Sequence, residues 1–381
     1  MTTDPISYLS NVSSFLAMEV FARAEELEKE GRDIIHLEFG EPDFPTPAII
    51  SEAAIQAIRD SRTRYTHTQG IMPFREAVAD KYKRQYQLNI SPGQILTSSG
   101  SSILLYMAIR LLVPPGEDII MTNLCYACYD NLAIIAGVNP VRVDIHLEDN
   151  FELDVNAVKK AITPKTRAIL INSPMNPTGT VLSRSCLKEL AALGIPIISD
   201  EIYADLTYEG EIYSVLNYTD NCIVLNGLSK YYAMTGWRLG YMIINPAWVS
   251  VAAKIHQNMM ISASEFVQKA GAVAISKAED ECAKMAKAFN ERRKFALKRL
   301  VESGLDPGYR PVGAFYIFLR YQKKNIDSLT LSMDILEKTG VALTPGIDFG
   351  PGGEGFIRIS YANSMEHIDE AITRLERYFF S

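Results

Sequence analysis

Three residues whose chemistry is complementary lie close together in the sequence: Ser229, Lys230 and Arg238. A lysine amine becomes a useful nucleophile toward aldehydes when its surroundings lower its pKa. An arginine guanidinium offers a planar set of donors that suits a phosphate, and a serine hydroxyl adds another donor. Together they predict a site for a ligand that carries both an aldehyde and a phosphate. Taken alone, the stretch also fits a surface lysine near an ordinary Gly236-Trp237 turn.

Other polar residues lie at the ends of apolar runs elsewhere in the chain. Asn176 and Asp200 each close or follow such a run, Tyr203 comes shortly after Asp200, and Arg358 lies within an apolar stretch near the C-terminus. Near-continuous apolar strands are typical of a parallel sheet, and ligands of such sheets bind beyond the carboxyl ends of the strands. We therefore expect these residues to share one site with Lys230.

The elements that must position these residues follow an α/β pattern. Short apolar runs occupy 94–97, 118–122, 140–145, 167–172, 196–199 and 222–226. Helical patterns between them begin near Ser101, Asp154 and Ser183, where serine or aspartate suits an N-cap. The flanks are helical at 13–30 and 278–303. A chain of 381 residues is long enough for two domains.

In their order and spacing, these segments resemble fold-type I enzymes that use pyridoxal 5'-phosphate, specifically the class I and II aminotransferases related to aspartate aminotransferase. The resemblance runs from the Gly-Glu-Pro-Asp segment at 40–43 to Arg358. It implies a large domain with a mostly parallel seven-stranded sheet and a small α+β domain built from both termini. The expected boundaries are 1–45 for the N-terminal segment of the small domain, 46–280 for the large cofactor-binding domain and 281–381 for the C-terminal small domain.

The resemblance assigns catalytic roles to three residues and a cofactor contact to a fourth. Lys230 forms a Schiff base with the cofactor aldehyde and moves a proton during the reaction. Asp200 lies against the pyridine nitrogen and keeps it protonated, so that the ring withdraws electrons. Tyr203 and Asn176 donate hydrogen bonds to the phenolate oxygen of the cofactor. From the residues alone, Asp200 is also a plausible cap of the turn that follows it, and both roles can hold.

The cofactor phosphate has its own expected site. Gly100, Ser101 and Ser102 open a helix, and the free N–H groups and partial positive charge of a helix N-terminus suit a dianion. The resemblance adds Ser229 and Arg238 to this phosphate site.

Two tyrosines match aromatic positions of the family. Tyr126 corresponds to the residue that stacks on the pyridine ring, although Asn123 and Ala127 replace the prolines usual around it. Tyr65 corresponds to the tyrosine that reaches the phosphate of the neighbouring subunit. The resemblance therefore implies a homodimer with shared active sites.

Substrate recognition depends on an arginine in the same comparison. Arg358 binds the substrate α-carboxylate in a bidentate manner, beside Gly40 and Asn176, although a strand arginine can also form a structural salt bridge. Ser101 stands where some aspartate-specific relatives carry a lysine for the distal carboxylate, which disfavours dicarboxylates. Four residues in segments expected at the pocket mouth favour apolar or aromatic amino acids: Tyr8, Phe15, Leu16 and Tyr316.

The resulting prediction is an aminotransferase that moves an amino group between an L-amino acid and a 2-oxo acid by ping-pong chemistry. A pyridoxal-phosphate-dependent C–S β-lyase or cyclase on the same fold is the alternative, because it would share nearly all of these residues. A regulator that senses the cofactor would carry an added DNA-binding domain, and the chain begins directly with family-like sequence.

Composition excludes several other classes of protein. The net charge of −7 and the pI near 5.4 argue against binding to nucleic acid or an anionic membrane. No apolar run or basic N-terminal region suggests a membrane span or a signal peptide, so we expect a cytoplasmic protein. The pair Cys125 and Cys128 has a redox or half-zinc spacing, but no second pair accompanies it, so no metal site is expected.

Overall fold

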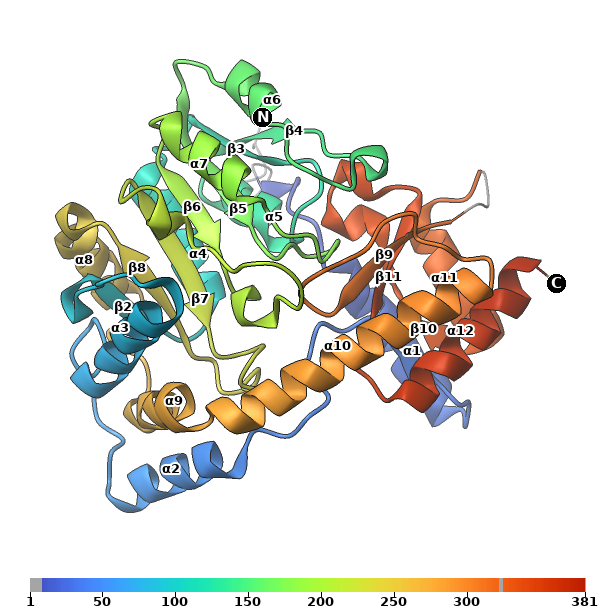
Figure 1. Cartoon of the computed structure of the whole chain (residues 1–381), viewed down its shortest axis with the longest axis horizontal. Helices are drawn as coiled ribbons and strands as arrows, with labels where there is room; N and C mark the ends of the chain where they lie inside the picture. Colours follow the sequence, from blue (N-terminus) through green and yellow to red (C-terminus); the bar gives the residue numbers. More distant parts are fainter. Residues whose placement is uncertain (1–8, 322–324, 381) are drawn as a thin grey trace, which may run out of the picture.

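The computed structural model describes residues 9–321 and 325–380, and at its centre lies a seven-stranded sheet (Figure 1). The strands follow the order β2-β8-β7-β6-β5-β3-β4. They are β2 (Ile95–Ser98), β3 (Asp118–Thr122), β4 (Asn139–Val143), β5 (Thr166–Asn172), β6 (Ile197–Asp200), β7 (Cys222–Gly227) and β8 (Gly240–Ile244). Only β8 runs against the others, antiparallel to β2 and β7. The predicted α/β fold with a mostly parallel seven-stranded sheet is confirmed.

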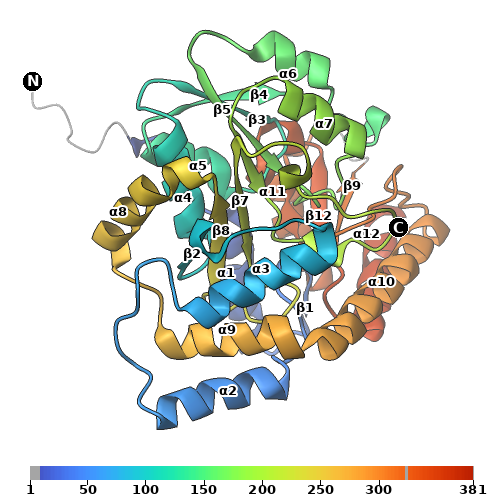
Figure 2. The ribbon, with the colours of Figure 1, turned by 60° about the vertical axis from the view of Figure 1, so that its left-hand side comes forward.

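Helices cover both faces of this sheet. They are α2 (Ala48–Arg59), α3 (Met72–Tyr86), α4 (Ser101–Leu112), α5 (Cys128–Ile135), α6 (Val155–Ala161), α7 (Arg184–Ala192), α8 (Val249–Met260) and α9 (Glu265–Lys277). Alternate strand residues such as Leu170 and Ile198 pack with α4, α5 and α8, whereas Ile169 and Ile197 join a cluster with α3, α7 and α9. Successive residues of a strand point to opposite faces, so two apolar layers explain the continuous apolar runs. In Figure 2, α3, α9 and α2 lie one after another on one side of the molecule.

The two ends of the chain meet in a second group of elements. These are α1 (Leu16–Lys29), β1 (Ile35–His36), α10 (Glu279–Glu302), β9 (Tyr316–Arg320), α11 (Ser328–Thr339), β10 (Val341–Ala342), β11 (Thr344–Pro345), β12 (Phe356–Ser360) and α12 (Met365–Phe380). The strand β1 pairs with β10, and β11, β12 and β9 form an antiparallel sheet. The long helix α10 runs from the large sheet to this group (Figure 1). The boundaries at residues 45 and 280 remain a prediction.

Short 3-10 helices complete the described secondary structure, at Pro92–Gln94, Leu147–Asp149, Ala204–Leu206, Val215–Asn217, Pro246–Trp248, Gly346–Phe349 and Pro351–Gly353. In the part of the chain that the structure describes, no helix is long and apolar enough to cross a membrane.

The helix starts differ in one respect from the sequence prediction. Asp154 and Ser183 are N-caps as predicted, since each side chain accepts a backbone N–H from the first turn of its helix. Ser101 is instead the first residue of α4, and Gly100 is the N-cap, with a φ of 94°. A positive φ of this size is accessible mainly to glycine, which leaves the start of α4 open on the side of the expected phosphate site.

The sheet brings the expected site residues to one edge. Asn172 ends β5 and Asp200 ends the neighbouring strand β6, where the two residues are register partners. Asp200 is in turn the register partner of Leu225 in β7, and Lys230 follows soon after that strand. Residues that follow these strand ends therefore gather at one place, as parallel topology requires.

Candidate active site

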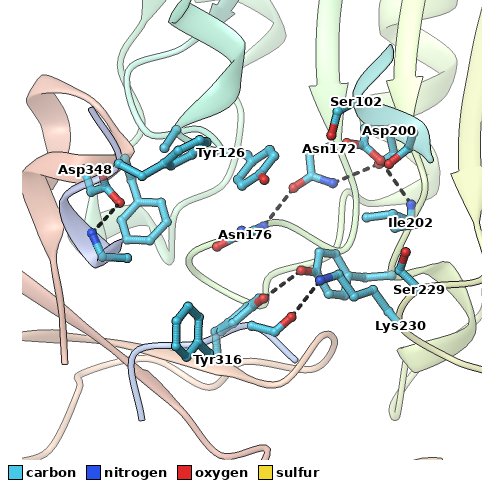
Figure 3. Close-up of a pocket in the computed structure, with 18 of the residues that line it drawn as sticks. Ser102, Tyr126, Asn172, Asn176, Asp200, Ile202, Ser229, Lys230, Tyr316 and Asp348 are labelled. Carbon is cyan, nitrogen blue, oxygen red and sulfur yellow. Dashed lines mark hydrogen bonds between the residues drawn. The ribbon is translucent and has the colours of Figure 1, made fainter. Parts of the chain in front are cut away.

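Eleven of the residues singled out from the sequence line one cavity of about 310 Å³ at this edge of the sheet (Figure 3). They are Gly40, Ser101, Ser102, Tyr126, Asn176, Asp200, Tyr203, Ser229, Lys230, Arg238 and Arg358. Phe15 and Tyr316, named for the pocket mouth, also line it, whereas Leu16 does not. Tyr8 lies outside the described residues.

The Lys230 amine is held inside this cavity and is not a surface group. Its Nζ donates a hydrogen bond to the Gly40 carbonyl at 2.6 Å. Burial lowers the pKa of Lys230 from 10.5 to about 8, and the positive charges of Arg358 and Arg238 add to this effect. A lysine with such a pKa is partly neutral near physiological pH, so it can act as a nucleophile or a base.

Asp200 is a buried carboxylate, 7% exposed, with two hydrogen-bond donors of its own. Its Oδ1 accepts the backbone N–H of Ile202 at 3.2 Å, and its Oδ2 accepts the Tyr129 hydroxyl at 2.7 Å. Burial raises the pKa of Asp200 above its ordinary value, while the two hydrogen bonds and the charge of Lys230 act in the opposite direction. The turn-capping role expected from the sequence therefore coexists with a carboxylate that lines the cavity.

Two asparagines connect the end of β6 to the substrate side of the cavity. The Asn172 side chain donates to the Asp200 carbonyl at 2.9 Å and accepts the backbone N–H of Asn176 at 2.8 Å. Asn176 in turn accepts a hydrogen bond from Arg358 Nη1 at 3.0 Å. Sequence reasoning singled out Asn176 but missed Asn172, which holds its loop.

Arg358 is buried among neutral partners. It is 5% exposed, and its Nη2 donates to the Glu38 carbonyl at 2.5 Å and to Thr344 Oγ1 at 3.0 Å. The guanidinium carbon lies 4.3 Å from the centre of the Tyr316 ring and 4.8 Å from that of Phe349. Among the described residues, Nε has no hydrogen-bond partner and no carboxylate pairs with this group. The guanidinium charge is therefore available to an anion in the cavity, and a structural salt bridge is not observed there.

Three tyrosines frame the space between these groups. Tyr203 Oη and Tyr316 Oη share a hydrogen bond of 2.7 Å, in which either can donate. Tyr126 lies across the cavity from Lys230 in Figure 3, and its ring contacts that of Tyr129 edge-on at 5.7 Å. Asn123, which replaces a family proline, is buried and accepts the backbone N–H of Ile145. This hydrogen bond fixes the strand end that leads to Tyr126.

The side chain of Arg238 lies against the start of α4 at Gly100. A Cβ atom on Gly100 would lie only 2.5 Å from Arg238 Nη2, so the guanidinium can approach the start of α4 only because residue 100 is glycine. Ser101, Ser102 and Ser229 line the cavity beside it. The N-terminal N–H groups of a helix, a guanidinium and three hydroxyls form a suitable site for a phosphate dianion.

Comparison with known proteins agrees with this geometry. A family described as "Aminotransferase class I and II" matches residues 32–375. The chain belongs to the class I and II aminotransferases. It is 40% identical to the (5-formylfuran-3-yl)methyl phosphate transaminase of Methanocaldococcus jannaschii, over 97% of this chain and 98% of the relative. It is 37% identical to an aspartate aminotransferase of Pyrococcus horikoshii, over 94% and 93% of the two chains.

Solved structures agree as well. The aspartate aminotransferase from Thermotoga maritima superposes with a TM-score of 0.93 at 34% identity, covering 98% of this chain and all of that one. A Methanococcus jannaschii protein whose active site is described as similar to that of kynurenine aminotransferases gives a TM-score of 0.90 at 40% identity, covering 98% of this chain and 99% of that one. This aminotransferase therefore uses pyridoxal 5'-phosphate, the cofactor of its family.

The residues of the cavity fit that cofactor. A buried carboxylate, Asp200, suits the pyridine nitrogen, and the amine of Lys230 suits the aldehyde. The cradle between Gly100 and Arg238, which a Cβ would fill, suits the phosphate. The unpartnered Nε of Arg358 suits the carboxylate of an amino-acid substrate.

Two predicted cofactor contacts do not line this cavity: Gly100, which lies next to it against Arg238, and Tyr65, which lies away from it. Tyr65 is 81% exposed, in the loop that precedes α3. The neighbouring Thr66 and Thr68 tie this loop to the body through Ser262 and the Ile261 carbonyl. Within its own chain Tyr65 therefore does not line the cavity.

Among the described residues, no cysteine lines this cavity, although Cys128 is hydrogen-bonded to the cavity residue Tyr126. Cys125 is a buried free thiol whose pKa is raised by burial, and Cys128 is also a free thiol. In the described part of the chain, no group of three or more histidine, cysteine or acidic side chains could hold a metal ion.

Proposed function

We propose that this cavity transfers an amino group from an amino acid to a 2-oxo acid in two half-reactions that use the same residues. Pyridoxal 5'-phosphate, when bound, supplies an aldehyde that condenses with amines and a ring that takes up electrons from Cα. The observation that carries the proposal is that the amine of Lys230, the carboxylate of Asp200 and the guanidinium of Arg358 line one cavity.

Lys230 is the acid and base of the reaction in this proposal. With the cofactor bound, it would remove the proton from Cα of the amino acid and deliver a proton to the cofactor carbon that carried the aldehyde. General-base catalysis needs a neutral fraction of the amine near the working pH, and burial with Arg358 and Arg238 nearby lowers the pKa of Lys230 to about 8, where such a fraction exists. The hydrogen bond to the Gly40 carbonyl orients the amine.

Asp200 holds a positive charge at the ring nitrogen. The hydroxyl of Tyr129 and the backbone N–H of Ile202 orient its carboxylate and oppose the rise in its pKa that burial causes. With the cofactor bound, Tyr203 and Asn176 would donate hydrogen bonds to its phenolate oxygen, and Tyr126 would lie against its ring.

The remaining groups bind and orient. The phosphate is held by the N-terminus of α4 from Gly100 to Ser102, by Ser229 and by Arg238. Arg358 binds the substrate α-carboxylate through Nε and Nη1, which orients Cα toward Lys230. The two aromatic rings against the guanidinium keep water from it and strengthen its attraction for an anion.

A homodimer with shared sites is also part of the proposal. Tyr65 is highly exposed, and further large apolar side chains are exposed on the same region of the chain: Ile49, Ile55, Ile58, Met72, Met259 and Ile261. Apolar exposure of this kind is typical of a surface that another chain covers. Tyr65 then contacts the phosphate site of the partner.

The substrate proposed here has an apolar or aromatic side chain. Phe15, Met18, Phe39 and Phe349 line the side of the cavity that leads away from the sheet, and Ser101 offers no cation to a distal carboxylate. Relatives are named both for aspartate and for aromatic amino acids, so their names alone do not choose. The cytoplasm is the proposed location, where free amino acids and 2-oxo acids are available.

A half-reaction screen tests the proposal. The holoenzyme is mixed with single amino acids in the absence of an oxo acid, and the cofactor absorbance and the products are followed. Transamination predicts one equivalent of 2-oxo acid and a cofactor that retains the amino group. Repeated turnover that releases ammonia and pyruvate without an oxo acid would instead show a β-lyase.

Two variants test whether turnover depends on residues of this cavity. Lys230→Ala should lose turnover and lose the borohydride-stable attachment of the cofactor. Asp200→Asn should retain the cofactor but react more slowly by several orders of magnitude, because the electron sink is weaker. Near-normal turnover in Asp200→Asn would restrict Asp200 to capping the turn.

A further inference from the structure

One acidic side chain lies in the otherwise apolar wall of the cavity. Asp348, in the 3-10 helix Gly346–Phe349, lines the cavity together with Phe15, Met18 and Phe349. Figure 3 shows it on the side of Tyr126, across the cavity from Lys230. A substrate side chain that extends away from the reacting carbon would approach this wall.

The carboxylate of Asp348 also joins two distant parts of the chain. It accepts the backbone N–H groups of Leu16 at 2.9 Å and Ala17 at 3.4 Å, the first two residues of α1. These contacts hold the start of α1, which carries Met18, against the cavity. The N-terminus of α1 carries a partial positive charge, so these contacts orient the negative charge of Asp348 and balance it only in part.

Among the described residues no lysine, arginine or histidine forms an ion pair with Asp348. Burial raises the pKa of Asp348, its two backbone hydrogen bonds and the positive charge of Arg358 act in the opposite direction, and Glu19 adds a second negative charge nearby. The cationic side chains that line the cavity are Lys230, Arg238 and Arg358. All three have other tasks in the proposed reaction, so the described residues of this chain offer no further cation in the cavity for a second carboxylate of the substrate.

A distal carboxylate would therefore meet a second negative charge in a poorly hydrated cavity. Like charges repel more strongly when water is excluded, and an unpaired carboxylate also loses its hydration. A neutral aliphatic or aromatic side chain suffers neither cost and gains contact with Phe15 and Phe349.

We propose that Asp348 is a specificity-determining residue that excludes dicarboxylates, so that the enzyme uses amino donors and 2-oxo acids with uncharged side chains. The inference rests on the proposed function, because it concerns the same cavity. The exclusion applies in both half-reactions, so the oxo-acid acceptor also carries a single carboxylate.

Glutamate and glutamine provide the first test, because they have nearly the same size and differ in charge. In single-turnover half-reactions of the holoenzyme, glutamine should show at least a 10-fold higher second-order rate constant than glutamate. Asp348→Asn should reduce this ratio by about 10-fold or more, while the rate with phenylalanine changes little. Asparagine keeps an oxygen that can accept from the start of α1, so the variant removes mainly the charge.

A matched control separates charge at the cavity from the loss of a helix cap. Asp327 accepts the backbone N–H of Thr330 at the start of α11 and does not line the cavity. Asp327→Asn should therefore leave the ratio of glutamine to glutamate unchanged. A wild-type enzyme that prefers glutamate, or an Asp348→Asn variant with an unaltered ratio, would overturn the proposal.

A binding measurement on the wild type avoids dependence on the fold of the variant and on turnover. Pentanoate and glutarate have the same number of carbons, and glutarate has a second carboxylate. Pentanoate should bind the holoenzyme at least 10-fold more tightly, as measured by calorimetry or by displacement of a bound amino-acid analogue. Tighter binding of glutarate overturns the inference, whereas failure of all amino acids to react, with pentanoate still preferred, would count against the proposed function alone.

Discussion

Replacing Lys230 by methionine should make the cofactor-free protein more stable at pH 7 and less stable above pH 10. Methionine has a similar length and no charge, so it leaves the cavity wall largely unchanged. The buried lysine has a folded-state pKa of about 8 against an ordinary value of 10.5. Its protonated form is therefore disfavoured by folding, and the protein is less stable wherever the unfolded chain keeps this amine protonated.

The size of the effect follows from two opposing contributions. The depressed pKa corresponds to roughly 3 kcal/mol of destabilisation at pH 7, which declines above pH 8 and is nearly gone at pH 10.5. The hydrogen bond from Lys230 to the Gly40 carbonyl contributes about 1 kcal/mol of stability at any pH. Lys230→Met removes both, so it should gain about 2 kcal/mol at pH 7 and lose about 1 kcal/mol near pH 10.5.

Urea unfolding of the cofactor-free proteins, followed by circular dichroism at pH 7, 9 and 10.5, measures this difference. Lys254, an exposed lysine on α8, supplies the control, because Lys254→Met should show no such change of sign. Equal stability of the wild type and Lys230→Met at pH 7 would refute the reasoning, because it would mean that burial does not disfavour the charged amine.

Three further substitutions probe the rest of the site. Tyr129→Phe removes a hydrogen bond to a buried carboxylate, worth about 1.5–3 kcal/mol, and should slow the half-reaction roughly 10- to 150-fold without loss of cofactor; an unchanged rate would make this contact structural only. Gly100→Ala should weaken cofactor binding at least 10-fold in a fluorescence titration, because its Cβ would displace Arg238; unaltered affinity would remove Arg238 from the phosphate site. Tyr65→Phe should raise the cofactor Kd by the equivalent of about 1.5–3 kcal/mol, and mixed dimers with Lys230→Ala subunits should restore wild-type affinity at the lysine-bearing site; failure to restore it would mean that Tyr65 acts within its own chain.

The pattern of apolar runs could predict most of the sheet but not all of it. Six runs coincide with β2 to β7, because a strand buried on both faces must be apolar at nearly every position. The seventh strand, β8, has the same kind of sequence and runs in the opposite direction. Its composition is that of a buried strand, but the runs assigned from the sequence end at residue 226, so only the family resemblance predicted a seventh strand. Its direction could not be predicted, because burial on both faces fixes the composition of a strand and not its direction.

The site residues also divide into those that the sequence could predict and those that it could not. Lys230 and Asp200 could be found because each lies in a short segment whose residue types suggest chemistry. Tyr129 could not, because its hydroxyl meets Asp200 across 71 residues of sequence and nothing in its local segment marks that contact. Asp348 contacts Leu16 over a separation of 332 residues, so its position in the cavity depends on the meeting of the two chain ends.

The charges of the cavity connect substrate binding to the strength of the base. The positive charge of Arg358 helps to hold the pKa of Lys230 down at about 8. A carboxylate bound at Arg358 neutralises that charge, so the amine becomes a stronger base when a substrate is present to give up its proton.

Pentanoate, which carries a carboxylate and no amine, should reproduce this effect in the cofactor-free protein. Acetylation of Lys230 by acetic anhydride, a neutral reagent, can be followed over pH by mass spectrometry, since only the unprotonated amine reacts. The midpoint should lie near pH 8 without pentanoate and move upward when Arg358 is occupied, because the protonated amine is then less disfavoured. In Arg358→Gln the midpoint should be higher from the start and insensitive to pentanoate. A midpoint in the wild type that ignores pentanoate would show that Arg358 does not control the base, and burial alone would then account for the lowered pKa of Lys230.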